Sequence, residues 1–273
     1  MSKTSLVTLI IPAMNEENRL AKPLVEYLEY FNTIYPNNFE IIVVINGTTD
    51  KTEQVVINLQ EKYPQLKYLV YPEKIGKGGA IKQGYKHACS SLIAFADADG
   101  STKPETLGNI IQTLEKEPQL DAVIGSRKVK GSIVSNRVKF REIFSWGFHL
   151  GVNLGFNLGI KDTQCGAKVV RKSMVEKILP VLTISNMAFD VNLLVAIKKN
   201  GGKILEIPVE WVDDFESSIK KPWKTAYIMA LSVFRLWIIY SPFKTIIYPI
   251  FDPFISFYWN KFVEPERELQ PKD

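Results

Sequence analysis

Short apolar segments alternate with helical patterns in the N-terminal part of the chain, and this alternation restricts the possible folds more than any other feature. Segments 6–11, 39–45, 68–71 and 92–95 are apolar and bounded by turn residues, which predicts buried strands. Helical patterns cover 20–31, 53–59 and 80–89, and another helix is expected after Pro104. This order predicts an α/β fold, a mostly parallel sheet with helices on both faces.

Each predicted strand is followed at its carboxyl end by polar residues or glycines. They are Asn15 and Glu16, Asn46 and Asp50, the glycine-rich segment 76–79, and Asp97 and Asp99. The carboxyl ends of parallel strands meet at one edge of an open sheet, which is where such sheets bind ligands. The convergence predicts a nucleotide site in which a metal ion holds the diphosphate.

Asp97 and Asp99 are the residues on which this site depends most. They take alternate positions after an apolar strand, so both carboxylates can point the same way. Converging carboxylates repel each other unless a hard divalent cation such as Mg²⁺ or Mn²⁺ neutralises them. The alternative is a solvated turn at the strand end. Segment 76–79 matches neither a Walker loop nor a Rossmann fingerprint, and a tight strand-to-helix turn would also account for its glycines.

Length, charge and cysteine content narrow the class of protein further. The 273 residues can form one large α/β domain, or one domain with an appendage. A net charge of +5 suits an anionic partner such as a nucleotide, a lipid phosphate or a membrane surface. The two cysteines lack metal-binding spacing, so we expect neither a disulfide framework nor a zinc site. We therefore expect the protein to reside in a reducing compartment. The N-terminal apolar run ends at Pro12, too early for a signal peptide.

Several motifs, in order and spacing, resemble the family 2 glycosyltransferases. They are residues 11–16, 44–52, 76–80 and 97–100. Downstream, residues 125–127, Arg137, Arg141, 162–168 and 188–190 resemble the polyprenyl-phosphate branch, most of all the dolichyl-phosphate β-glucosyltransferases. The resemblance covers about residues 6–221. It implies a GT-A fold, a nucleotide-sugar donor, a divalent metal and an inverting transfer to a lipid phosphate such as dolichyl or another polyprenyl phosphate.

The resemblance also implies which residues bind the nucleotide. They are Pro12, Ala13, Asn15, Glu16, Ile45, Asn46, Lys77, Gly78, Asp97 and Ala98. Many relatives carry an acidic pair where this chain has Ile45 and Asn46, and a carboxylate suits the N–H face of guanine. An amide suits uracil, which presents one N–H between two carbonyls. Asn46 therefore favours a UDP-sugar, with a GDP-sugar as the alternative.

Metal, sugar and acceptor sites follow from the same resemblance. The metal set is Asp97, Asp99 and, at the position of a glutamine in related mannosyl-phosphate synthases, Ser101. The sugar pocket is formed by Asp162, Thr163 and Gln164. The acceptor phosphate is expected to meet Arg127, Arg137, Arg141 and Lys221, because guanidinium groups bind phosphate oxygens in pairs. Solvated surface positions are the alternative for each of these basic residues.

Asp190 stands where transferases that act on hydroxyl acceptors place a general base. A lipid monophosphate is already ionised near neutral pH, because its second pKa is about 6, so no proton has to be removed. We therefore expect Asp190 to orient the sugar or an arginine. The expected catalytic set is Asp97, Asp99, Arg127 and Asp190. Rival functions are a GDP-mannose user, a transferase with a hydroxyl acceptor and Asp190 as base, and a nucleotide-sugar binder without catalysis.

The composition changes at Pro222. Residues 223–262 are dense in aromatic and aliphatic side chains, but charges and prolines interrupt every run before the ~18 residues of a spanning helix. Aromatic residues flanked by lysines suit a headgroup boundary. We expect a catalytic domain over 1–221, membrane-associated amphipathic helices over 222–263 and a disordered tail over 264–273, on the cytoplasmic face of a membrane. The alternative is a helix packed on the catalytic domain or in a homo-oligomer interface. No nucleic-acid partner is expected.

Overall fold

We describe the protein from a computed structural model. The described residues are 6–135, 148, 151–153, 155–212, 222–241, 245, 249–251 and 253. The strands are β1 (Val7–Ala13), β2 (Phe39–Asn46), β3 (Leu66–Tyr71), β4 (Leu92–Phe95), β5 (Ala122–Ser126), β6 (Ile133–Ser135), β7 (Lys168–Arg171), β8 (Ile204–Pro208) and β9 (Glu210–Val212). The helices are α1 (Ala21–Ile34), α2 (Thr52–Gln60), α3 (Gly76–His87), α4 (Pro104–Lys116), α6 (Lys172–Ile178), α7 (Phe189–Lys199) and α8 (Pro222–Tyr240), with a 3₁₀ turn over Leu179–Val181.

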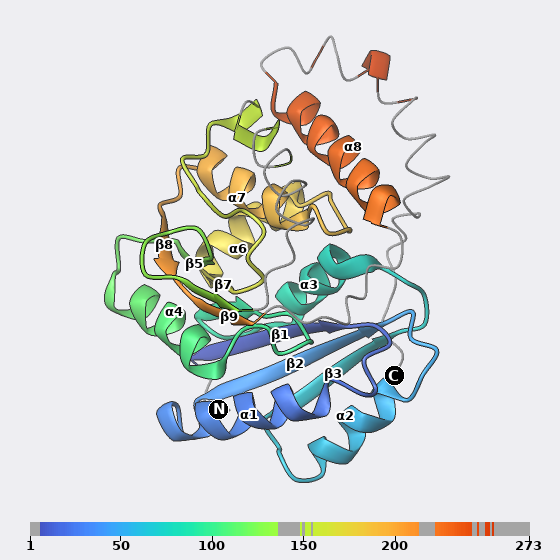
Figure 1. Cartoon of the computed structure of the whole chain (residues 1–273), viewed down its shortest axis with the longest axis vertical. Coiled ribbons are helices and arrows are strands. Elements are labelled where there is room, and N and C mark those ends of the chain that lie inside the picture. Colours follow the sequence, from blue (N-terminus) through green and yellow to red (C-terminus); the bar gives the residue numbers. More distant parts are fainter. Residues whose placement is uncertain are drawn as a thin grey trace.

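A seven-stranded sheet forms the centre of the molecule (Figure 1). Its order is β3-β2-β1-β4-β7-β5-β8, and every neighbouring pair is parallel except the two that involve β7. β7 runs antiparallel between β4 and β5, with Lys168 opposite Phe95 and Ile124. β6 and β9 form a separate two-stranded sheet. The predicted α/β class and the parallel sheet are confirmed.

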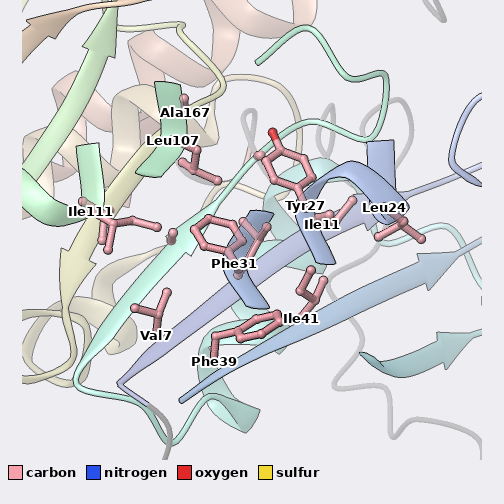
Figure 2. Close-up of a cluster of buried hydrophobic side chains, with 14 of the residues drawn as sticks. Val7, Ile11, Leu24, Tyr27, Phe31, Phe39, Ile41, Leu107, Ile111 and Ala167 are labelled. Atoms are coloured by element: carbon pink, nitrogen blue, oxygen red, sulfur yellow. The ribbon is translucent and has the colours of Figure 1, made fainter. Parts of the chain in front are cut away.

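The two faces of the sheet bury different helices because successive strand residues point in opposite directions. Leu9 and Ile11 of β1 belong to a core formed with α1 and α4, where Phe31 is fully buried (Figure 2). Ile10, between them, belongs to the core on the opposite face, formed with α3, α6 and α7. A third cluster joins α7 to α8 through residues such as Leu194. The double-sided burial explains why the strands read as continuous apolar runs.

One local prediction needs correction. The helix expected over 80–89 begins at Gly76, so the glycine-rich segment is the first turn of α3 and not a loop before it. β4 ends at Phe95, as predicted, and Asp97 and Asp99 lie in the turn that follows it. Both cysteines are free, as expected from their spacing. Among the described residues, no helix has the length and hydropathy needed to cross a bilayer.

α8 lies at the end of the molecule farthest from α1 and α2 (Figure 1). One side of it packs on α7, and Ser232 and Leu236 on that side are fully buried. Its exposed positions are residues 223, 227, 230, 234 and 237. This spacing places them on a single stripe, within roughly 80° of the helix circumference. The stripe carries two tryptophans, a tyrosine and a phenylalanine: Trp223, Tyr227, Phe234 and Trp237.

Candidate active site

The polar strand ends meet at one edge of the sheet. β1, β2 and β4 are parallel and deliver the segments after Ala13, Asn46 and Phe95 to this edge. Because β7 is antiparallel, its first residue, Lys168, lies at the same edge, and so does the segment before it. The candidate site is therefore built from carboxyl ends of parallel strands and the amino end of one antiparallel strand.

Asp97 is held at this edge by a lysine and shaped by a glycine. Its Oδ1 lies 2.7 Å from Nζ of Lys77, in the first turn of α3. A Cβ on Gly166 would lie 2.0 Å from Oδ2 of Asp97, so only glycine fits at position 166 with the carboxylate in this place. A quarter of the Asp97 side chain, 26%, is exposed and can reach a ligand.

Asp99 lies close enough to Asp97 for the two charges to interact. The pKa of Asp99 is raised, first by burial and then by the Asp97 charge, against hydrogen bonds from Ser101. Ser101 N donates to Asp99 Oδ1 at 3.0 Å, and Ser101 itself is buried. No three His, Cys, Asp or Glu side chains converge on one point within the described residues. Two carboxylates in a partly buried turn still fit a divalent cation that takes its other ligands from a diphosphate and water.

A strand beside the site holds the loop that carries Ser101. Val212 N in β9 donates to Ser101 O at 3.1 Å, and Thr102 forms an isolated bridge with Trp211. Lys103 pairs with Glu210 at the start of β9. The turn after β4 is therefore held on its far side by β9.

Asp190 lies deeper than Asp97 and is enclosed by two lysines. Nζ of Lys168 lies 2.5 Å from its Oδ1, and Nζ of Lys77 lies 3.4 Å from its Oδ2. Burial would raise the pKa of Asp190, but Lys168 and then Lys77 outweigh it and lower the pKa. Burial likewise opposes the charge of Lys77, yet Asp190 and Asp97 raise its pKa. Asp190 is thus ionised, 1% exposed and has an ammonium group at each oxygen.

Asn46 forms three hydrogen bonds to the backbone through its side-chain amide. Its Nδ2 donates to Ala13 O at 3.2 Å, and its Oδ1 accepts from the backbone N–H groups of Ile75 and Gly76, each at 3.2 Å. The side chain is 3% exposed. This geometry ties β1 and the start of α3 to the end of β2. Because Oδ1 of Asn46 already accepts two backbone hydrogen bonds, it is not available for the N–H group of uracil, and the preference for uracil inferred from Asn46 loses its basis.

The loop after β1 is also fixed by side chains. Asn15 adopts a left-handed conformation, with φ at 57°, and its Oδ1 accepts from Thr49 N at 2.8 Å. Glu16 pairs with Arg19 through both oxygens, at 2.9 and 3.0 Å. Burial raises the pKa of Glu16 despite this pairing. The loop thus presents a fixed backbone and a buried carboxylate at the predicted nucleotide site.

Most of the remaining residues predicted to bind the nucleotide could contact it mainly through backbone groups, because their side chains are apolar. Ile45 and Ala98 are buried in the core, and Pro12 and Ala13 close β1. A Cβ on Gly78 would lie 2.5 Å from Cβ of Phe189, so this glycine allows α3 to approach α7 closely.

Arg127, which is partly exposed, forms an ion pair with the buried Asp162. Arg127 Nε donates to Asp162 Oδ2 at 2.7 Å, and Nη2 donates to Oδ1 at 3.0 Å. The guanidinium also lies 5.0 Å from the ring centroid of Trp211. Burial opposes the charge of Asp162, but Arg127 holds the pKa of this carboxyl well below its usual range. The carboxylate expected in the sugar pocket is therefore engaged with the arginine expected at the acceptor phosphate.

The neighbours of Asp162 differ in what they offer a ligand. Thr163 is buried, and the Nε2 atom of Gln164 is buried without a hydrogen-bond partner among the described residues. Such a donor fits a contact with a polar ligand. Burial raises the pKa of the Cys165 thiol to about 11, which makes this cysteine a packed residue and a poor nucleophile. Arg137, Arg141 and Lys221 lie outside the described residues.

Two residues at this edge were absent from the predicted site: Lys168 and Trp211. Lys168 is fully buried although it opens an apolar strand, and a lysine beside apolar β-strand residues is the signal that could have marked it. Trp211 lies in the three-residue strand β9, which the sequence patterns do not predict, and nothing in the sequence points to its contact with Arg127.

Comparison with known proteins places this geometry in a family. Residues 8–179 match the model of the glycosyl transferase family 2. The chain belongs to this family. A dolichyl-phosphate β-glucosyltransferase of Trichomonas vaginalis is 36% identical over 242 residues, covering 86% of this chain and 73% of the relative. Those of Saccharomyces cerevisiae and Homo sapiens are 30% and 31% identical over 75% and 81% of this chain, and 66% and 72% of their own lengths. These relatives are glycosyltransferases, as this enzyme is.

Solved structures give the fold. Glucosyl-3-phosphoglycerate synthase of Mycobacterium tuberculosis with Mn²⁺, UDP-glucose and phosphoglyceric acid aligns with a TM-score of 0.67 at 13% identity, covering 86% of this chain and 80% of that one. The same enzyme with Mg²⁺ and UDP aligns with a TM-score of 0.64 over 86% and 79%. At this identity the likeness establishes the GT-A fold of the family 2 member described here.

Proposed function

We propose that this enzyme transfers glucose from UDP-glucose to dolichyl phosphate, with inversion and with dependence on Mg²⁺ or Mn²⁺. The observation that carries the proposal is the pair Asp97 and Asp99 beside Lys77 at the carboxyl edge of the sheet. The relatives named dolichyl-phosphate β-glucosyltransferase support the acceptor and the sugar. The structural neighbours with UDP-glucose and Mn²⁺ support the donor and the metal.

In the proposed reaction, an acceptor phosphate oxygen forms a bond to the anomeric carbon while the bond from that carbon to the UDP oxygen breaks. The electron pair leaves with UDP. A cation bound by Asp97 and Asp99 would neutralise the departing diphosphate. Lys77 would add a fixed positive charge at the same place. Arg127, oriented by Asp162 and Trp211, would contact the acceptor phosphate, together with the predicted Arg137, Arg141 and Lys221.

Asp190 has no role as a base in this proposal. Its carboxylate is 1% exposed, and each oxygen faces a lysine ammonium, which is an unsuitable setting for accepting a proton from a hydroxyl. An ionised phosphate needs no base. The geometry therefore supports a lipid-phosphate acceptor over a glycan or glycolipid hydroxyl.

The membrane part of the proposal rests on α8. Its exposed stripe of Trp223, Tyr227, Phe234 and Trp237 is an apolar surface of the kind that lies at a headgroup boundary. We propose that α8 docks the enzyme on the cytoplasmic face of a membrane as a peripheral protein, while its buried side stays packed on α7.

A panel of radiolabelled UDP- and GDP-sugars, incubated with the enzyme, dolichyl phosphate and Mn²⁺, tests the function directly. We expect label from UDP-glucose to enter the organic phase, and to stay in water when EDTA replaces Mn²⁺. Asp97→Ala should lose most of the transfer activity, and Asp190→Asn should lose less. Transfer only from GDP-mannose would replace the donor in this proposal, and a larger loss in Asp190→Asn would support base chemistry.

A further inference from the structure

Four side chains of alternating charge run inward from the edge of the site. Asp97 contacts Lys77 at 2.7 Å, Lys77 reaches Asp190 at 3.4 Å, and Asp190 contacts Lys168 at 2.5 Å. The exposed fractions fall along the series, from 26% for Asp97 and 10% for Lys77 to 1% and 0% for the inner pair. The series ends at a lysine that no ligand in the site can reach.

Lys168 is fixed by partners of three kinds. Its Nζ donates to Asp190 Oδ1 and to Cys165 O, each at 2.5 Å, and lies 5.5 Å from the ring centroid of Phe95. It opens β7, whose register against β4 and β5 sets the position of its backbone. The place of this charge is therefore determined by the sheet and does not depend on the donor.

The distances show how Lys77 is shared. Its ammonium lies 0.7 Å closer to Asp97 than to Asp190, the difference between 3.4 and 2.7 Å. Asp190 is almost completely buried, so it needs a compensating cation, and Lys168 supplies one. With Lys168 absent, the only other ammonium at Asp190 within the described residues would be that of Lys77. Asp190 would then draw Lys77 inward, away from Asp97.

We propose that Lys168 is a positioning residue, which satisfies Asp190 and thereby keeps Lys77 at Asp97, beside the place of the metal and the diphosphate. This inference rests on the proposed function for its catalytic consequence. Its effect on Asp97 and Asp99 is independent of any substrate. Lys77 at Asp97 competes with a divalent cation for that carboxylate and limits its affinity. The same ammonium contributes to binding the charge of the leaving diphosphate.

Lys168→Met tests the proposal through metal affinity as well as rate. Titration of the full-length enzyme with Mn²⁺ alone, read from the electron paramagnetic resonance signal of free Mn²⁺, should show about tenfold tighter binding, because one positive charge is lost and Lys77 moves away. The kcat for glucose transfer should fall on the order of 10²-fold, with a smaller change in KM. Lys168→Arg should restore part of both values.

Lys172→Met is the matched control. It removes the same charge four residues further on, at the opposite edge of the sheet, where Lys172 N donates to Ser91 O. We expect its Mn²⁺ affinity and kcat to equal those of the wild type. If Lys168→Met does not fold, the double variant Lys168→Met with Asp190→Asn replaces it. This variant removes both charges of the buried pair, so that Lys77 keeps its contact with Asp97. This double variant should fold and bind Mn²⁺ within about twofold of the wild type.

The outcomes separate the two proposals. Unchanged Mn²⁺ affinity and unchanged kcat in folded Lys168→Met would overturn the role of Lys168 alone. Tighter Mn²⁺ binding by an enzyme that transfers none of the sugars would uphold it and refute the proposed substrates. A double variant that binds Mn²⁺ tenfold more tightly than the wild type would overturn the positioning role, because Lys77 would then not be what limits the affinity. A wild type that binds no Mn²⁺ would overturn both.

Discussion

Gly166→Ala should disable the enzyme without unfolding it. The new Cβ would lie 2.0 Å from Oδ2 and 2.6 Å from Cγ of Asp97, while ordinary contacts begin at 3.4 Å. The carboxylate would have to move by about 1.4 Å, the difference between 3.4 and 2.0 Å. Such a shift separates Asp97 from Lys77, which lies at 2.7 Å, and displaces the proposed metal ligand.

The magnitude follows from the displacement. A misplacement of about 1 Å in a reacting group typically costs on the order of 10²-fold in rate, which corresponds to about 2.7 kcal/mol in activation free energy. We expect kcat/KM for glucose transfer to dolichyl phosphate to fall by at least this factor. The thermal unfolding midpoint should change by only a few degrees, because Asp97 is partly exposed and can turn toward solvent.

Two comparisons make this prediction refutable. Gly151→Ala serves as the control, since a Cβ there meets nothing within 4 Å, and its activity should match the wild type. If Gly166→Ala acts through Asp97, combining it with Asp97→Ala should cost no more than Asp97→Ala alone. Additive losses, or wild-type kcat/KM in Gly166→Ala, would show that the close approach of Gly166 does not position Asp97.

Three further predictions concern the pair of Arg127 and Asp162, Asn46 at the end of β2, and the exposed stripe of α8. Asp162→Asn should lower the free energy of unfolding by about 2 kcal/mol at pH 7, because the charged acceptor of the Arg127 hydrogen bonds is lost. Because the pKa of Asp162 is lowered in the fold, this difference should shrink as pH falls below about 4 in denaturant titrations. A difference that stays constant with pH would contradict the pairing. Asn46→Asp loses the donor to Ala13 O and should destabilise the fold by about 2 kcal/mol. Calorimetry should show the same ratio of UDP affinity to GDP affinity as in the wild type. An inverted ratio would show that residue 46 contacts the nucleotide base directly. The double variant Trp223→Ser with Trp237→Ser should lower the partition coefficient for liposomes, measured by flotation, by about tenfold per side chain. A partition coefficient equal to that of the wild type would refute docking through the stripe.

The sequence predicts the first half of the sheet well because the signals there are local. Each of the first four strands is a short apolar run, and the parallel order follows from the helices between them. The polar strand ends correctly indicate which residues gather at one edge of the sheet, Asp97 and Asp99 among them, and this edge is the candidate site. These features need only the neighbouring residues and the chain direction.

The partners of the site residues could not be predicted in the same way, because they come from distant segments. Asn46 reads as a ligand residue at a strand end, yet it bonds backbone groups of Ile75 and Gly76 about 30 positions away. Arg127 reads as a phosphate ligand, yet its guanidinium meets Asp162, 35 positions away. Both residues lie at the edge of the sheet that forms the candidate site, but their described contacts are within the protein.

β7 is the element that explains these distant pairings. It has only four residues, begins with a lysine and pairs antiparallel between two strands that precede it by many residues, so no local period predicts it. Its reversed direction brings the segment before it to the edge where the parallel strands end. Asp162 then meets Arg127 after β5, and Gly166 meets Asp97 after β4.

Lys168 extends this arrangement to a third element, because it meets Asp190 at the start of α7. Segment 162–168 thus contacts the ends of two strands and one helix within seven positions. Asp162 is 1% exposed and Lys168 is fully buried, so neither presents its charge to solvent. The spacing of the motif is therefore set by the distance between these elements, and its charged residues act first by placing others. An insertion of one residue between Gly166 and Lys168 should accordingly break the contact of Gly166 with Asp97 or that of Lys168 with Asp190 and abolish transfer, whereas one between Gly201 and Gly202, in the turn before β8, should leave transfer intact.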